Sequence, residues 1–126
     1  MKKVVFVDDS KTVLLTAQMA LQDLINEKKL ELKTFENPLE FLSEVNNGFV
    51  YDLLITDINM PQMNGLEMVK KLQENSNLDL KPVLVLTTET SIEKKREARK
   101  LGISGWVTKP FTPDKLKMAI KRVLRV

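Results

Sequence analysis

The 126-residue chain contains no cysteine and no histidine. Without cysteine it forms no disulfide and has no thiol nucleophile, and without either residue type it lacks the usual ligands of a zinc site. The absence of histidine also removes the common general base near neutral pH. Any chemistry must therefore come from carboxylates, lysine, hydroxyls, backbone groups or a hard cation. Mg²⁺ is the cation that best suits such oxygen ligands.

Long apolar runs and strong charge are also missing. No run approaches the ~20 residues that a membrane-spanning helix needs, and Met1-Lys2-Lys3 is not followed by the apolar region of a signal peptide. We therefore expect a cytoplasmic protein with no membrane insertion. The net charge is only +3, and the basic stretch 94–100 contains no interleaved aromatic residue, so we expect no nucleic-acid binding.

Four short apolar runs each end in a residue that can take part in phosphoryl chemistry. Val4–Val7 is followed by Asp8 and Asp9, Leu53–Thr56 by Asp57, Val83–Leu86 by Thr87, and Trp106–Thr108 by Lys109. Such β-branched, apolar runs are typical of buried parallel strands. In an open α/β sheet the ligand site lies outside the carboxyl ends of the strands. Neighbouring strands would thus bring three carboxylates, a hydroxyl and an ammonium to one place.

Strand-like and helix-like segments alternate along the whole chain, without a linker or repeat. We expect strands at 4–7, 30–35, 52–56, 82–86 and 104–108, with helices at about 11–27, after Pro38, after Gly65, at 92–101 and after Thr112. This (βα)₅ pattern predicts an α/β fold, a doubly wound parallel sheet of five strands. The length suits one domain, residues 1–126, and no output domain is expected.

Each acidic residue also has an ordinary structural interpretation. Asp8 and Asp9 could be acids that favour the start of a helix, but two adjacent carboxylates repel each other unless a cation lies between them. Asp57 could be a turn former before the loop at 59–64. Its place between the other strand ends favours instead a nucleophile that attacks phosphorus beside Mg²⁺.

Thr87 and Lys109 are less specific. Thr87 could simply fill its strand or cap a helix near Glu89, although its hydroxyl can donate to a phosphoryl oxygen. Lys109 could be a surface charge, but it precedes Pro110 in a peptide bond that can be cis, and its ammonium suits phosphate.

Four segments together resemble the receiver domains of two-component response regulators. They are Val-Asp-Asp-Ser at 7–10, Thr-Asp-Ile-Asn-Met-Pro at 56–61 with Asn64-Gly65, Leu-Thr-Thr at 86–88, and Gly-Trp-Val-Thr-Lys-Pro-Phe at 105–111. The resemblance covers the whole chain and is strongest to stand-alone chemotaxis regulators. It implies a flavodoxin-like sheet with strand order 2-1-3-4-5.

The resemblance also implies roles for individual residues. Asp57 would accept the phosphoryl group, Thr87 and Lys109 would bind its oxygens, and Asp9, Asp57 and the backbone carbonyl of Asn59 would ligate Mg²⁺, with Asp8 acting through bound water. Asn59 and Glu89 match positions that tune hydrolysis of the acyl phosphate. Trp106 matches an aromatic switch position usually held by Tyr or Phe; otherwise it is a partly exposed strand aromatic.

The implied function is that of a monomeric signalling protein rather than an enzyme, although it would assist its own phosphorylation and dephosphorylation. A histidine kinase of the chemotaxis type would phosphorylate it. A flagellar motor switch protein would bind to the face formed by 92–101, 104–108 and the last helix. A phosphatase would be another partner. Two alternatives remain. One is a phosphorelay carrier or other single-domain receiver, and the other a Mg²⁺-dependent aspartyl phosphohydrolase.

Overall fold

The computed structural model describes residues 1–74 and 81–125. In chain order the described elements are β1 (Lys2–Val7), α1 (Lys11–Ala20), α2 (Gln22–Asn26), β2 (Leu30–Phe35), α3 (Pro38–Asn46), β3 (Leu53–Thr56), α4 (Gly65–Glu74), β4 (Val83–Thr87), α5 (Ile92–Lys100), β5 (Gly105–Thr108) and α6 (Pro113–Leu124). No helix within these residues is long and apolar enough to cross a membrane.

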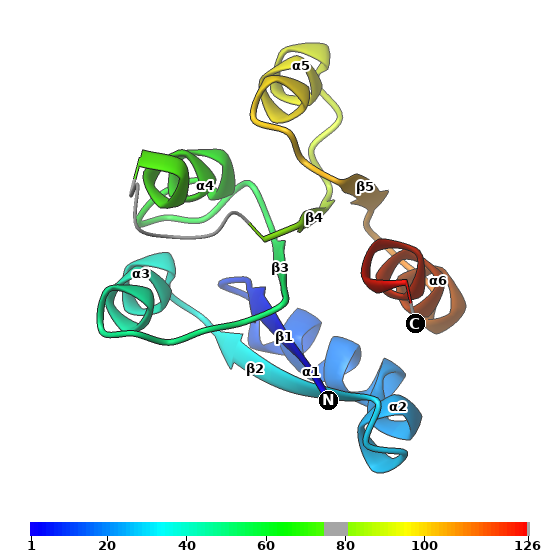
Figure 1. Cartoon of the computed structure of the whole chain (residues 1–126). Helices are drawn as coiled ribbons and strands as arrows, with labels where there is room; N and C mark the ends of the chain where they lie inside the picture. Colours follow the sequence, from blue (N-terminus) through cyan, green and yellow to red (C-terminus); the bar gives the residue numbers. More distant parts are fainter. Residues whose placement is uncertain (75–80, 126) are drawn as a thin grey trace.

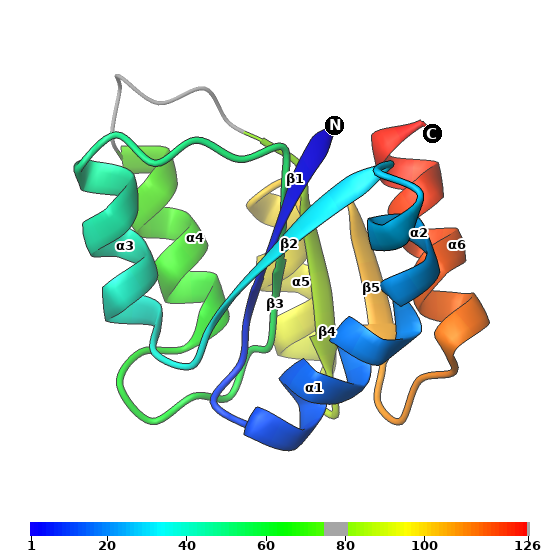
Figure 2. The ribbon, with the colours of Figure 1, turned by 90° about the horizontal axis from the view of Figure 1, so that it is seen from below.

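The strands form one parallel sheet with the order β2-β1-β3-β4-β5. Helices α1, α2 and α6 cover one face, and α3, α4 and α5 cover the other (Figure 1). Both the doubly wound fold class and the strand order expected from the sequence are confirmed. The carboxyl ends of the strands gather at one edge of the sheet, the lower edge in Figure 2.

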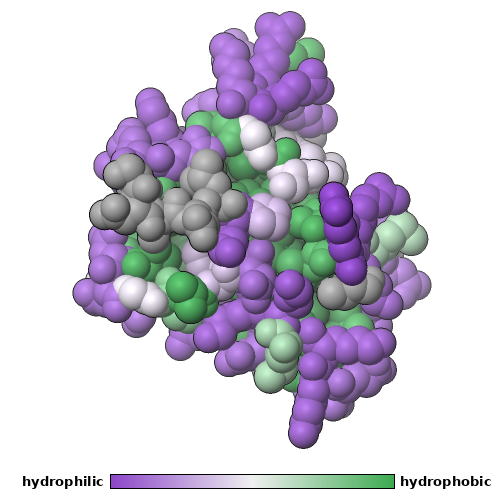
Figure 3. All heavy atoms as spheres, in the orientation of Figure 1, coloured by the Kyte–Doolittle hydropathy of each residue, from purple (hydrophilic) through white to green (hydrophobic). Residues whose placement is uncertain are grey.

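The core consists of apolar layers on the two faces of the sheet. Alternate strand residues point to opposite faces, so that Val4 and Phe6 pack beneath α1 and α6 whereas Val5 and Val7 pack beneath α3 and α4. The outer surfaces of the helices are largely hydrophilic in the view of Figure 3. Helix α5 is held more loosely, since Ala98 is its one fully buried residue. This agrees with the few apolar positions in its sequence.

The predicted helix at 11–27 is interrupted. At Leu21 the backbone takes φ −99° and ψ 2°, which separates α1 from α2. Hydrogen bonds from Leu21 N–H to Ala17 and from Ile25 N–H to Leu21 nevertheless continue across the break. The distortion is therefore local, and Leu21 and Leu24 are both buried. The strand predicted at 30–35 matches β2 at both ends, and the other predicted strand boundaries differ from the observed ones by at most two residues, the usual uncertainty at element ends.

Candidate functional site

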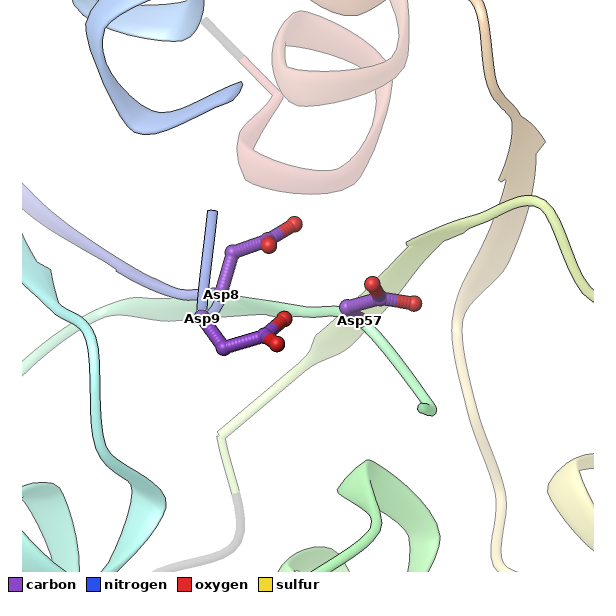
Figure 4. A group of neighbouring side chains, drawn as sticks. All are labelled: Asp8, Asp9 and Asp57. Atoms are coloured by element: carbon purple, nitrogen blue, oxygen red, sulfur yellow. The ribbon is translucent and has the colours of Figure 1, made fainter. Parts of the chain in front are cut away.

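The residues singled out at the strand ends lie together at the carboxyl edge of the sheet. Asp8 and Asp9 follow β1 and Asp57 follows β3, its central neighbour. Thr87 ends β4, and Lys109 follows β5. Figure 4 shows the carboxylates of the three aspartates reaching over the same part of this edge. The strands pair in parallel, so their carboxyl ends lie next to one another. The side chains that follow them are therefore close in space although they are far apart in the sequence.

Lys109 connects two of the three carboxylates. Its ammonium donates a hydrogen bond to Asp8 Oδ2 at 2.7 Å and another to Asp57 Oδ2 at 3.0 Å. The Lys109 side chain is only 12% exposed, and those of Asp8 and Asp57 are 0% and 11% exposed. Three charged groups thus share a largely buried site, where removal of Lys109 would leave two buried carboxylates without a counter-charge.

Burial and hydrogen bonding oppose each other in setting the pKa values of Asp8 and Lys109. It raises the pKa of Asp8 above its ordinary value, although the hydrogen bonds from Lys109 and from the Ser10 backbone N–H oppose the rise. Burial acts in the opposite direction on Lys109, but hydrogen bonds to Asp8 and Asp57 outweigh it, and the pKa of Lys109 is raised. Lys109 is therefore a permanent cation at neutral pH.

The three aspartates form a cluster that could hold a metal ion. One carboxylate oxygen from each of Asp8, Asp9 and Asp57 lies within 4.8 Å of the others. Asp9 is exposed while the other two are buried, so the cluster opens to solvent on one side. An all-oxygen, strongly anionic donor set fits a hard divalent cation that retains some of its water.

The backbone around Asp57 is held in place from three sides. The N–H of Ile58 donates to Asp57 Oδ1 at 2.7 Å, which orients the carboxylate. The Thr56 hydroxyl donates to the Asp57 carbonyl at 2.8 Å, and the Asp57 N–H donates to the Val7 carbonyl at 3.1 Å. The buried Thr56 was not singled out from the sequence, where it looks like an ordinary β-branched strand residue.

Gly65 is a second residue whose importance only the structure shows. A Cβ atom at this position would lie 2.0 Å from the Asp57 carbonyl oxygen, far inside van der Waals contact. The Gly65 N–H also donates to the Ile58 carbonyl at 2.8 Å. The start of α4 thus packs directly on the backbone that carries Asp57, and only glycine allows this approach. The Asn-Gly pair at 64–65 belongs to the segments that carry the family resemblance, but the residue pattern alone predicts only a loop there and not this contact.

Thr87 lies next to Lys109 across the β4–β5 pair. It is fully buried, and its carbonyl accepts a hydrogen bond from the Lys109 N–H at 2.8 Å. Its hydroxyl accepts a hydrogen bond from the Glu89 N–H at 3.1 Å. The hydroxyl therefore belongs to the turn after β4 in this structure. The Lys109–Pro110 peptide bond is cis, the isomer considered from the sequence.

Asn59 and Glu89 meet above the sheet edge. The Asn59 side-chain amide donates to Glu89 Oε2 at 3.0 Å, and the Ser91 N–H donates to Glu89 Oε1 at 3.2 Å. These contacts, the Asn59 hydrogen bond first, lower the pKa of Glu89. The pair joins the loop after β3 to the loop after β4.

Trp106 lies on β5 with its ring against α5. It packs on the small apolar cluster that includes Val85 and Ala98, and the Lys95 ammonium lies 5.8 Å from the ring centroid. Its indole N–H is buried and has no hydrogen-bond partner among the described residues. A buried donor without an acceptor costs free energy. A shift of the indole that gave this N–H an acceptor would therefore be favourable.

The comparisons with known proteins agree with this geometry. A family model described as the response regulator receiver domain matches residues 4–121. Chemotaxis protein CheY1 of Helicobacter pylori is 36% identical over 122 residues, covering 97% of this chain and 96% of that protein. Chemotaxis protein CheY of Pseudomonas aeruginosa is 32% identical over 121 residues, covering 96% and 94%. The structure of Vibrio cholerae CheY4 superposes with a TM-score of 0.85 at 40% identity, covering 98% of this chain and 99% of that one. The chain belongs to the receiver-domain family of response regulators, and it is similar to CheY proteins over nearly its whole length.

Proposed function

We propose that this chain accepts a phosphoryl group on Asp57. The observation that carries the proposal is the shared hydrogen bonding of Lys109 to Asp8 and Asp57. The ammonium holds the Asp57 carboxylate at the strand edge and remains available to a phosphoryl oxygen. A buried cation beside the nucleophile stabilises negative charge as it develops during transfer.

The acidic cluster is proposed to bind Mg²⁺. Asp9, Asp57 and the backbone carbonyl of Asn59 would be direct ligands, and Asp8 would act through bound water. When bound, Mg²⁺ neutralises charge on the transferring phosphoryl group. The chain's own carboxylates are otherwise a barrier to an anionic phosphodonor, because among the described residues Lys109 is the one cation paired with Asp8 and Asp57.

The donor is proposed to be a phosphohistidine on a histidine kinase. A carboxylate oxygen of Asp57 would attack phosphorus as the bond from phosphorus to the histidine nitrogen breaks, giving an acyl phosphate and free histidine. Lys109 and the Thr87 hydroxyl would bind the transferred oxygens. Attack by water would later release inorganic phosphate and restore Asp57, and Asn59 with Glu89 would tune the rate of that step.

The signal is proposed to travel through Thr87 to Trp106. Drawing the Thr87 hydroxyl toward the phosphoryl group would break its hydrogen bond with the Glu89 N–H. The space that Thr87 leaves would favour an inward shift of the Trp106 ring, which has an unpaired N–H to satisfy. Since α5 is anchored mainly by Ala98, this shift would bias the surface made by α5, β5 and α6 between two states.

Chemotaxis is the proposed setting, because the CheY proteins to which the chain is similar are named as chemotaxis proteins. The target on the α5–β5–α6 surface would then be a flagellar motor switch protein, and the kinase one of the chemotaxis type. Transfer of the phosphoryl group onward to a histidine domain would instead identify a phosphorelay carrier.

Intact-mass measurement tests the proposal. The wild-type protein, incubated with acetyl phosphate and Mg²⁺, should gain one phosphoryl group, and Asp57→Asn should gain none. Asp114→Asn, a matched change at an exposed position of α6, should behave like wild type. Chelation of Mg²⁺ should prevent the reaction. An unmodified wild-type protein that is folded would contradict the proposal.

A further inference from the structure

The strand β2 forms a free edge of the sheet. It pairs with β1 on one side and has no neighbour on the other among the described strands. In Figure 2 it crosses the front of the molecule with no helix over the middle of the strand. The edge is therefore accessible to another extended segment.

The backbone of β2 determines which groups face outward. The carbonyls of Lys29 and Phe35 accept hydrogen bonds from Lys2 and Asp8, so the odd-numbered residues face β1. Because the direction alternates along a strand, the N–H and C=O groups of Leu30, Leu32 and Thr34 point away from the sheet. These outward groups are available for a second strand.

The strand β2 also carries two charged side chains, of which the Lys33 ammonium lies 5.7 Å from the Phe35 ring centroid. Glu31 and Lys33 are exposed, and neither forms an ion pair within the part of the chain that the structure describes. They are two residues apart, so they lie on the same face of the sheet. A partner strand that offers the opposite charges in the opposite order would pair with both.

A second copy of β2 in antiparallel orientation provides that order. With Leu32 opposite Leu32 of the second copy, Glu31 lies opposite its Lys33 and Lys33 opposite its Glu31. The outward residues then form the hydrogen-bonded pairs, and the charged residues form the pairs whose side chains are closest. A shift by two residues in either direction would place Glu31 opposite Glu31 or Lys33 opposite Lys33, which is unfavourable.

The helix beside this edge has an exposed apolar residue on the same flank. Leu15 of α1 is 58% exposed, and with Gln18 and Thr34 it lines a groove between α1 and the end of β2. A two-fold axis through the Leu32 pair, perpendicular to the sheet, would bring α1 of each copy to the same side. The groove would then be part of the contact.

From these observations we propose that the protein self-associates through β2, in an antiparallel pair centred on Leu32, as a two-fold symmetric dimer. The family resemblance in the sequence leads to a different expectation, a monomer. The edge strands β2 and β5 lie at opposite ends of the sheet, so the dimer leaves the α5–β5–α6 surface of each copy open.

A dimer would present two such surfaces to a target with repeated sites, which increases the apparent affinity. A strand edge is smaller than a standard interface, so the dimer should be in rapid exchange with monomer.

Sedimentation velocity over a concentration series, with charge variants, tests this arrangement. Lys33→Glu places Glu opposite Glu31, and Glu31→Lys places Lys opposite Lys33, so each variant alone should be monomeric. An equimolar mixture of the two should form a heterodimer, because opposite charges then face each other. The double variant Glu31→Lys/Lys33→Glu should recover the homodimer.

A backbone variant provides an independent test. Thr34→Pro removes one outward N–H without touching the pairing with β1, and proline is tolerated at such an edge position. It should be monomeric, with far-UV circular dichroism like that of wild type. Asp57→Asn should dimerise normally, which separates this proposal from phosphorylation. A wild-type protein that stays monomeric at its highest attainable concentration, or a dimer that persists in Lys33→Glu and Thr34→Pro, would overturn the proposal.

Discussion

Asn59 and Glu89 are 30 residues apart in the chain, yet the Asn59 amide donates a 3.0 Å hydrogen bond to the Glu89 carboxylate. The contact places the Glu89 carboxylate beside the loop that follows Asp57. Because Asn59 and Ser91 hold the pKa of Glu89 below its ordinary value, the charge is present throughout the neutral and mildly acidic range.

Removing this charge should speed phosphorylation by small anionic donors. Glu89→Gln keeps a hydrogen-bond acceptor for Asn59 and should raise the rate with acetyl phosphate by roughly a factor of three, the size expected for one exposed charge. Glu74→Gln, at the far end of α4, is the matched control. Stopped-flow measurement of the sole tryptophan reports the rate, and equal rates in all three proteins would show that Glu89 does not repel the donor.

Lys109 should matter for stability as well as for chemistry. Lys109→Ala leaves Asp8 and Asp57 buried without a counter-charge and should lower the free energy of unfolding by about 3 kcal/mol in the absence of metal. Added Mg²⁺ should restore part of the loss, since a ligand of the folded state stabilises it. Urea denaturation with and without Mg²⁺ measures both effects. Lys117→Ala, which breaks the more exposed pair with Asp23, should cost much less.

Gly65 and Gly102 offer a matched pair of glycine substitutions. Gly65→Ala forces a Cβ against the Asp57 carbonyl and should destabilise the protein by more than about 2 kcal/mol, as in other overpacked sites. Gly102→Ala meets no atom within 4 Å but must adopt φ +80°, which should cost about 1 kcal/mol. Thermal unfolding ranks the two. A Gly65→Ala protein as stable as Gly102→Ala would mean that α4 moves away from Asp57 without difficulty.

Trp106 should respond differently to two substitutions. Trp106→Phe keeps the aromatic contact with α5 and removes the unpaired N–H, so stability should be unchanged or higher by up to about 1 kcal/mol. Trp106→Ala should leave phosphorylation intact but weaken binding of the phosphorylated protein to its target. Isothermal titration with the target measures the second effect, and equal affinities of the alanine variant and wild type would remove Trp106 from the signalling route.

The Asp23–Lys117 pair between α2 and α6 should make a pH-dependent contribution to stability. The hydrogen bond from Lys117 holds the pKa of Asp23 below its ordinary value. The pair therefore stabilises the fold fully at pH values above the pKa of the unfolded carboxyl, and the contribution disappears as the pH falls through the lowered folded value. Melting temperatures of wild type and Asp23→Asn should differ near neutral pH and converge in acid. A difference that is constant from neutral pH to strong acid would assign the effect to something other than charge.

The residues at the strand ends were predictable because the carboxyl ends of parallel strands lie together at one end of the sheet. A residue that directly follows an apolar run is therefore expected there. Runs such as Val4–Val7 and Leu53–Thr56 are buried on both faces, so their ends are marked by the first charged residue, here Asp8 and Asp57. Burial of the apolar faces then restricts the register between neighbouring strands. The strand order was accessible only through the family resemblance, since alternation of strands and helices allows several orders.

Other features could not be predicted, because they depend on how close two segments approach. The contact of Gly65 with the Asp57 backbone is set by the angle at which α4 leaves its loop. The Asn59–Glu89 hydrogen bond depends on the side-chain rotamers of two loops. The break at Leu21 is a small change in the backbone. The apolar periodicity over 11–27 continues across it, so the sequence pattern does not reveal it.

The central claim is that Asp57 itself carries the phosphoryl group. Tandem mass spectrometry of the protein phosphorylated with acetyl phosphate and Mg²⁺, after reduction of the acyl phosphate with borohydride, locates the modified carboxyl directly. The account predicts modification at Asp57 alone. Modification of Asp8 or Asp9 with Asp57 unchanged, or no modification of a folded protein under any condition, would contradict it.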